Sequence, residues 1–203
     1  MDVPSSDIAF TPTIKAIQAA RGSRATYARM EARGGFRTDM DENLAAFLEG
    51  IDTAYLATAN AAGQPYAQHR GGPKGFIRVL GPQTLGWTDY VGNRQYVTLG
   101  NLSENPKAFI FLMDYANSQR VKLWGTARVV EDDRKLIQSL ADPNYPAEPE
   151  RAILFTIQAW DINCPQHIHK RFSQRQIAPI IERLEHRVQE LEAQLRNKQG
   201  TSP

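Results

Sequence analysis

Two short segments of the chain carry basic side chains that could bind an anionic group. The first is Gln68-His69-Arg70-Gly71-Gly72-Pro73-Lys74-Gly75, at the end of an expected strand, and the second is Gly92-Asn93-Arg94-Gln95, which is expected to open a helix. An arginine guanidinium offers phosphate a planar pair of donors, glycines allow a ligand to approach the backbone, and a helix N-terminus attracts anions. Either segment alone is also typical of a solvated strand or helix end. The hypothesis of an anion site therefore rests on finding both on one scaffold.

Other chemistries have less support. The segment Asn163-Cys164-Pro165-Gln166-His167-Ile168-His169 contains a cysteine and two histidines, but the spacing Cys-x2-His-x-His matches no established four-ligand metal site. We expect this segment to form a loop at the edge of a cofactor site, without a metal. No pair of carboxylates, nucleophile elbow or Walker loop stands out, so hydrolysis and phosphoryl transfer have no basis in the sequence.

A series of β-prone segments separated by turn residues predicts the scaffold for these side chains. The expected strands are Thr53–Ala59, Pro65–Arg70, Gly75–Leu80, Thr84–Trp87, Ala108–Asp114, Arg120–Val130 and Arg151–Trp160. Several such strands in succession indicate a β-barrel or a sandwich. A helix over Asn93–Asn105 interrupts them, and another is expected after Asp132-Asp133. The three prolines between Asp142 and Pro149 require a loop.

Helices are expected at both ends of the chain. Near the N-terminus, Thr11-Pro12 starts one short helix, and Gly22-Ser23 separates it from a second. A third helix is expected behind the capping pattern Thr38-Asp39-Met40-Asp41. Near the C-terminus, apolar residues alternate at spacings of four and three, as in a coiled coil: Ile177, Ile181, Leu184, Val188, Leu191 and Leu195. This last helix is equally compatible with lying on its own domain, because three heptads are marginal alone.

Composition limits the class of protein. A chain of 203 residues is long enough for one sizeable core, and it has no apolar stretch near the roughly 20 residues of a membrane span. The N-terminus has no secretory signal pattern, so we expect a cytoplasmic protein. Cys164 is the single cysteine, which excludes an intramolecular disulfide. The formal net charge of +2 is too small to indicate binding to nucleic acid.

The chain resembles the pyridoxamine 5′-phosphate oxidase-like family of FMN-binding split barrels, from about Thr53 to Arg171. The motifs that carry the resemblance occur in the family's order, and they are Tyr55-Leu56-Ala57-Thr58-Ala59 with Gly63-Gln64-Pro65, Gly75-Phe76-Ile77-Arg78-Val79-Leu80, Trp87-Thr88-Asp89-Tyr90-Val91-Gly92-Asn93-Arg94, Asn101-Leu102-Ser103-Glu104-Asn105-Pro106, Arg120-Val121-Lys122-Leu123-Trp124-Gly125-Thr126-Ala127 and Asn163-Cys164-Pro165-Gln166-His167-Ile168. The resemblance implies a mainly β fold with helical attachments (α+β), which binds flavin mononucleotide (FMN) as a homodimer.

The resemblance also implies which residues contact the cofactor at a site between two subunits. They are Gln68, His69, Arg70, Gly71, Gly72, Lys74, Trp87, Thr88, Asn93 and Arg94, with Arg120 reaching the flavin from the other subunit. In pyridoxamine phosphate oxidases two basic residues usually stand where this chain has Arg94-Gln95, and the chain ends in a coiled-coil-like helix in place of their substrate-binding segment. FMN binding is therefore better supported than oxidation of a B6 vitamer.

These observations lead to two hypotheses of function. The first is an FMN-dependent oxidoreductase of unknown substrate, whose flavin is reduced by a nicotinamide or another donor. The alternative is a non-catalytic module that binds or senses flavin or haem and recruits a partner through the coiled coil. In both, residues 1–50 form a helical extension, 51–172 the split barrel, and 173–203 the amphipathic helix and tail.

Overall fold

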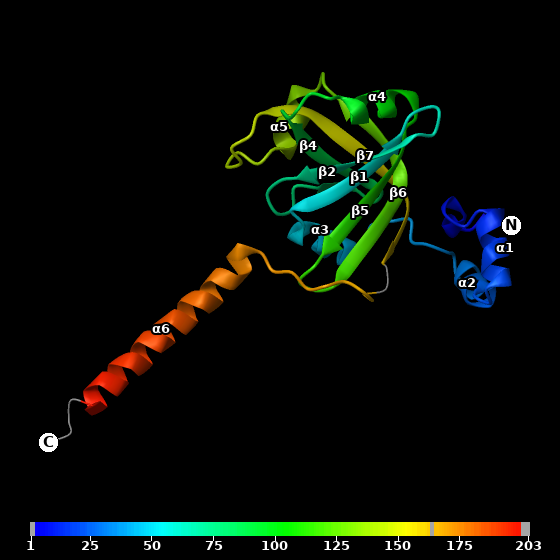
Figure 1. The fold of residues 1–203 in the computed structure, drawn as a ribbon. Helices are drawn as coiled ribbons and strands as arrows, with labels where there is room; N and C mark the ends of the chain where they lie inside the picture. The colour runs from blue at the N-terminus through cyan, green and yellow to red at the C-terminus, as the bar shows by residue number, and fades with distance from the viewer. Residues whose placement is uncertain (1–2, 163–164, 200–203) are drawn as a thin grey trace. The chain divides into compact units, whose positions relative to one another are not determined.

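The computed structural model of the protein describes residues 3–162 and 165–199. The chain divides into two compact units. The first consists of Met1–Asp114 with Gln119–Pro165, and the second consists of Tyr115–Ser118 with Gln166–Pro203. The first unit contains the sheet and all helices but one, and the second contains the long C-terminal helix (Figure 1).

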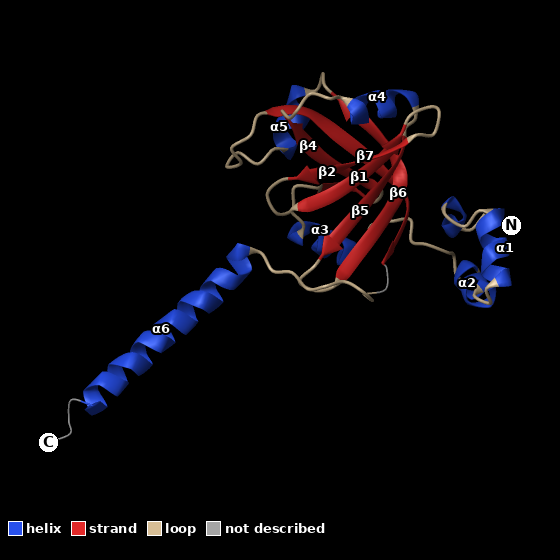
Figure 2. Ribbon diagram, in the orientation of Figure 1, coloured by secondary structure: helices blue, strands red, loops and turns tan. Residues whose placement is uncertain are grey.

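One antiparallel sheet of seven strands forms the centre of the first unit (Figure 2). Its order is β2-β1-β5-β6-β7-β4-β3, so β2 and β3 are the edges. The strands are β1 (Thr53–Ala59), β2 (Pro65–Gly71), β3 (Arg78–Gly81), β4 (Thr84–Tyr90), β5 (Lys107–Asp114), β6 (Gln119–Val130) and β7 (Pro149–Ile162). The expectation of a mainly β split barrel with helical attachments is confirmed.

Alternation of apolar residues explains why one face of the sheet is buried. In β6, Val121, Leu123, Gly125 and Ala127 are buried, while Lys122, Trp124 and Thr126 between them are partly exposed. Successive side chains of a strand point to opposite faces, so this pattern directs one set into a shared core. Leu56 of β1 and Phe155 of β7 belong to the same core cluster. The core therefore lies on one face of the sheet.

One expected strand starts later than the sequence pattern indicated. We expected a strand over Gly75–Leu80, but β3 begins at Arg78. Gly75 has a φ of +71°, and its N–H donates to the carbonyl of Ile51 at 2.8 Å. Phe76 then donates to the carbonyl of Pro73 at 3.0 Å, which closes a turn. These local bonds occupy the backbone groups that a strand would have offered to its neighbour.

The first unit also contains one 3-10 helix and several α-helices. They are η1 (Ser5–Ile8), α1 (Pro12–Ala20), α2 (Arg24–Glu31), α3 (Glu42–Gly50), α4 (Val97–Glu104) and α5 (Arg134–Leu140). Figure 1 shows α4 and α5 near one end of the sheet and α3 near the other. The sequence pattern placed the N-cap of α3 at Thr38, which was wrong. The N-cap is Asp41, whose side chain accepts from the N–H of Leu44 at 2.8 Å.

The start of α4 also differs from the expectation. A helix over Asn93–Asn105 was predicted, yet α4 begins only at Val97. Arg94 and Tyr96 have φ angles of 57° and 56°, in the left-handed region, and a right-handed helix cannot pass through such residues. Residues 92–96 therefore form a loop before the helix.

The second unit consists chiefly of α6 (Gln174–Gln199), which confirms that the heptad segment is helical. Pro179 lies within its first two turns. In the same unit, the guanidinium of Arg171 lies 4.8 Å from the ring centroid of Tyr115. Among the helices that the structure describes, none has the length and hydropathy needed to cross a membrane.

Candidate functional site

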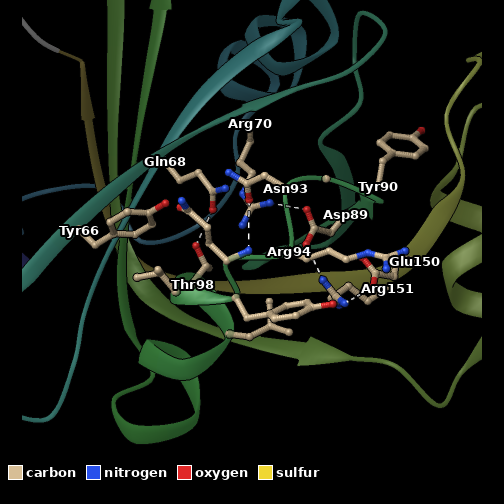
Figure 3. A pocket seen from close by; sticks show the side chains of 15 residues that line it. Tyr66, Gln68, Arg70, Asp89, Tyr90, Asn93, Arg94, Thr98, Glu150 and Arg151 are labelled. Atoms are coloured by element: carbon tan, nitrogen blue, oxygen red, sulfur yellow. Dashed lines mark hydrogen bonds and ion pairs between the residues drawn. The ribbon is translucent and has the colours of Figure 1, made fainter.

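A polar cavity of about 250 Å³ lies in the first unit, beside the loop that leads into α4 (Figure 3). Its walls come from β2, β4, the loop, the start of α4 and the beginning of β7. The lining residues are Tyr66, Gln68, Arg70, Asp89, Tyr90, Gly92, Asn93, Arg94, Gln95, Tyr96, Val97, Thr98, Leu99, Glu150 and Arg151. The cavity thus includes Gln68, Arg70, Asn93 and Arg94 from the set expected to bind the cofactor.

The alternation of β2 decides which of its side chains line the cavity. Gln68 and Arg70 are half-buried and line it, whereas His69 points to the opposite, exposed face. There His69 contacts the ring of Tyr55 edge to face, with 5.9 Å between centroids. Gln68 is held in place because its Oε1 accepts from the hydroxyl of Thr98 at 2.7 Å. Positions 68 and 70 therefore supply the amide and the guanidinium that this strand gives to the cavity.

A buried carboxylate links two of the arginines. Asp89 forms an ion pair with Arg70, and its other oxygen lies 3.4 Å from a guanidinium nitrogen of Arg151. The sheet register places Asp89 opposite Arg151 on neighbouring strands, which explains the second contact. Burial raises the pKa of Asp89, although the charges of Arg70 and Arg151 act to lower it. Burial likewise lowers the pKa of Arg70, against the attraction of Asp89.

Two further acids neutralise Arg151. Its Nη2 lies 2.6 Å from the carboxylate of Glu150, and its Nε lies 3.0 Å from that of Glu131. The ring of Tyr96 stacks near the same guanidinium, at 5.6 Å from the ring centroid. Arg151 therefore has acidic partners on several sides and little positive charge to offer to a ligand.

Arg94 differs from the other two arginines. Among the residues described, it forms no ion pair, and it lines the cavity from an irregular loop. Arg94 and Tyr96 both have positive φ, which costs about 1–3 kcal/mol each in residues other than glycine. Within the loop, Asn93 Oδ1 accepts from the N–H of Gln95 at 3.3 Å. Strained backbone of this kind is concentrated at ligand sites, which makes the loop a candidate binding element.

The remaining expected residues lie outside the cavity lining. Gly71 and Gly72 end and follow β2, and a Cβ at Gly72 would lie 2.7 Å from the Cβ of Phe76. Lys74 is exposed in the turn that follows. Trp87 is 2% exposed in the core, and its neighbour Thr88 donates its hydroxyl to the carbonyl of Ile137 at 3.0 Å.

Two predictions from the sequence remain, the role of Arg120 and the loop Asn163–His169 that was expected to bind no metal. Arg120 is half-buried on β6, and its Nε has no hydrogen-bond partner in the part of the chain described. His167 has a φ of 63° in the second unit, and His169 is exposed there, whereas Cys164 lies outside the described residues. Within residues 3–162 and 165–199, no group of three or more His, Cys, Asp and Glu side chains could hold a metal ion.

The cavity's donors fit the phosphate end of FMN. Among the residues described, Arg94 supplies a guanidinium without an ionic partner, Arg70 has a buried Nε without a hydrogen-bond partner, and Asn93 contributes an amide to the same lining. Guanidinium and amide donors are the groups that phosphate oxygens accept from. The volume lies just below the roughly 300–1,000 Å³ of complete small-molecule pockets. The cavity of a single chain is therefore large enough to enclose only part of a cofactor such as FMN.

Sequence reasoning missed the acids and Arg151. Asp89 follows Thr88 in a strand that was expected to end at Trp87, and period-two alternation from Trp87 would have placed Asp89 on the same face. Arg151 stood at the expected start of its strand. Only the pairing of β4 with β7 brings it to Asp89, and that register cannot be obtained from either segment alone.

A family model matches the part of the chain that forms the sheet. The family model for pyridoxamine 5′-phosphate oxidase matches residues 40–164, which is more than half of the chain. No match was found among curated proteins.

Three solved structures are among those similar to the chain. HupZ from Group A Streptococcus is 17% identical, with a TM-score of 0.47 and coverage of 66% of this chain and 100% of that one. A putative pyridoxamine 5′-phosphate oxidase from Lactobacillus delbrueckii is 24% identical, with a TM-score of 0.47 and coverages of 62% and 95%. HutZ, the haem storage protein of Vibrio cholerae, is 14% identical, with a TM-score of 0.41 and coverages of 60% and 93%. From the extent of the family match, the chain belongs to the pyridoxamine 5′-phosphate oxidase family.

Proposed function

We propose that the protein is an FMN-dependent oxidoreductase that binds its cofactor in the cavity beside α4. The observation that carries this proposal is the meeting of Arg70, Asn93 and Arg94 at one polar cavity of a chain from this family. Arg94, Asn93 and Arg70 would hold the phosphate, since all three line the cavity and carry guanidinium or amide donors. Bound FMN would supply the redox chemistry, and the chain would bind and orient it.

A second copy of the chain would complete the site. The cavity is small for a whole FMN molecule, and a flavin ring extending from it would need a further wall. The outer face of the sheet carries partly exposed apolar side chains that a partner could cover, among them Tyr55, Phe109, Phe111 and Met113. Homodimerisation through this face would bury them, and Arg120 of the second copy would contact the flavin.

Substitution of Arg94 tests the phosphate assignment. A charge-assisted hydrogen bond to a partly shielded phosphate contributes about 1.5–3 kcal/mol, so Arg94→Ala should weaken FMN binding roughly ten- to a hundredfold. Arg183→Ala is the matched control, because it removes one positive charge from exposed α6. Riboflavin, which has no phosphate, should bind both variants as it binds the unmodified protein. A fluorescence titration of each ligand into each variant gives the four affinities.

The titration can also contradict the proposal. Equal losses of FMN and riboflavin affinity in Arg94→Ala would show that Arg94 supports the fold or the ring, and the phosphate assignment would be withdrawn. No binding of FMN to the unmodified protein at saturating concentration would remove the cofactor itself.

A separate experiment tests the oxidoreductase activity. The FMN-loaded protein is mixed with NADH or NADPH without oxygen, and bleaching of the flavin absorption band reports its reduction. Bleaching supports an oxidoreductase that takes electrons from a nicotinamide. A stable yellow spectrum with both donors, and with the flavin still reducible by dithionite, would favour a module that binds or senses the cofactor.

A further inference from the structure

Within the described part of its own unit, the apolar stripe of α6 has no covering partner. Ile181, Leu184, Val188, Leu191 and Leu195 are each between 42% and 59% exposed. They follow Ile177 at alternating spacings of four and three along a continuous helix. Side chains at this spacing share one narrow face of a helix, as in a coiled coil. We propose that α6 pairs with α6 of a second copy as a parallel, two-stranded coiled coil.

The residue types in the stripe favour two parallel strands. In a heptad written abcdefg, the a positions are Ile181, Val188 and Leu195, and the d positions are Ile177, Leu184 and Leu191. The two central heptads thus have a β-branched residue at a and leucine at d. This combination favours parallel dimers over trimers and tetramers.

Charges beside the stripe specify the same orientation. Arg187 occupies a g position, and Glu192 occupies the e position of the following heptad. In a parallel dimer these two residues face each other across the interface, once in each direction. An antiparallel dimer would instead place e positions against e positions, which brings the acids Glu185 and Glu192 of one helix towards those of the other. Like charges in such contacts are destabilising.

The helix is able to form this interface over most of its length. Pro179 stands at an f position, which faces away from the stripe, and the heptads that follow it contain no proline. Arg187 contacts Glu190 of its own helix at 2.9 Å through one guanidinium nitrogen, which leaves further N–H donors of Arg187 for a carboxylate of the partner. Three heptads are marginal alone, but linkage to a barrel that also dimerises would raise their effective concentration.

Site-directed cross-linking of the full chain tests the arrangement. In a Cys164→Ser background, Leu191→Cys places a thiol at d, and Ala193→Cys places one at the outward f position of the same turn. In a parallel, in-register dimer the two Leu191→Cys thiols meet, so mild oxidation should give covalent dimers at least tenfold faster than with Ala193→Cys. Ile177→Cys, at the other end of the helix, should cross-link as fast as Leu191→Cys.

Charge reversal provides the second measurement. In the Leu191→Cys background, Arg187→Glu replaces two attractive pairs by repulsive ones and should slow cross-linking roughly fivefold. Adding Glu192→Arg restores opposite charges and should restore the rate. Equal cross-linking rates for Leu191→Cys and Ala193→Cys would overturn the coiled coil. Cross-linking of Leu184→Cys, without cross-linking of Ile177→Cys or Leu191→Cys, would overturn its parallel orientation. These readouts do not involve FMN, so they stand or fall separately from the proposed function.

Discussion

Asp89→Asn is expected to strengthen FMN binding, although it removes an ion-pair partner of two arginines in the site. The side chain of Asp89 lies between Arg70 and Arg151, and asparagine keeps its shape while removing its charge. A phosphate held by the far side of Arg70 would stand on the order of 7 Å from this carboxylate. At an effective dielectric constant of about 20, repulsion at that distance is roughly 2 kcal/mol for each unit of phosphate charge. Solvent at the mouth of the cavity reduces this, so we expect about a tenfold gain in affinity.

The gain should depend on pH in a definite direction. Burial holds the pKa of Asp89 above its ordinary value of 3.8, and the carboxyl repels phosphate only when ionised. The ratio of the two dissociation constants, unmodified protein over Asp89→Asn, should therefore be largest at neutral pH and approach one as the pH falls below that raised pKa. Titration of the phosphate itself, near pH 6, acts in the same direction, because the repulsion from Asp89 falls with the charge of the phosphate and the ratio falls with it.

The same raised pKa makes a prediction about stability. A carboxyl with a higher pKa in the folded state stabilises the fold at acid pH, below its unfolded pKa, and this contribution is lost as the pH rises through the folded value. The free energy of unfolding of the unmodified protein, relative to Asp89→Asn, should therefore decline between acid and neutral pH. Urea denaturation across that range measures the difference.

Isothermal titration with FMN and with riboflavin over a pH series checks the affinity. Asp161→Asn is the control, because this acid pairs with Lys122 at 3.3 Å and does not line the cavity. A fall in FMN affinity for Asp89→Asn would refute the reasoning, since it would mean that the carboxylate is needed to position Arg70. An equal gain for riboflavin would show that the effect does not act on the phosphate.

The remaining predictions concern stability and are read from urea denaturation. Gly125→Ala should destabilise the protein by about 2–3 kcal/mol, because a Cβ there would lie 2.0 Å from the carbonyl oxygen of Thr156 and the strands would have to separate; an unchanged midpoint would contradict this close approach. Asp133→Ala should cost about 1 kcal/mol by removing the cap that accepts from the N–H of Leu136 at 2.9 Å, whereas the neighbouring Asp132→Ala should cost little, and equal losses would count against the cap.

Local patterns were sufficient to predict most of the strands. In β6, buried residues at every second position were visible in the sequence as Val121, Leu123 and Ala127. Such alternation needs no knowledge of the neighbouring strands, since each side chain's face follows from the strand period. The order of the strands was not accessible in this way. The pairing of β4 with β7 joins segments about 65 residues apart, and it is this pairing that brings Asp89 to Arg151.

The error at α4 has a different physical origin. Gly92-Asn93-Arg94-Gln95 has the residue types of a helix start, and helix propensity alone does not forbid Arg94 in a helix. The structure instead places Arg94 and Tyr96 in left-handed conformations, at an energetic cost that the surrounding contacts must offset. Propensity reflects average conformations, so a strained loop at a site is where it is expected to fail.

The balance of charge in the cavity indicates what kind of ligand it can hold. Three arginines line the cavity, but the acids Asp89 and Glu150 also line it, and Glu131 contacts Arg151 as well. The formal charge of the lining is therefore only about +1, and it resides on Arg94, the arginine without an ionic partner among the residues described. A ligand with several phosphates would place its additional charges against these acids, of which Asp89 is buried, at a cost that grows with each phosphate. A cofactor with a single terminal phosphate matches this lining better than one with a diphosphate, and the affinity of FMN relative to flavin adenine dinucleotide should reflect that difference.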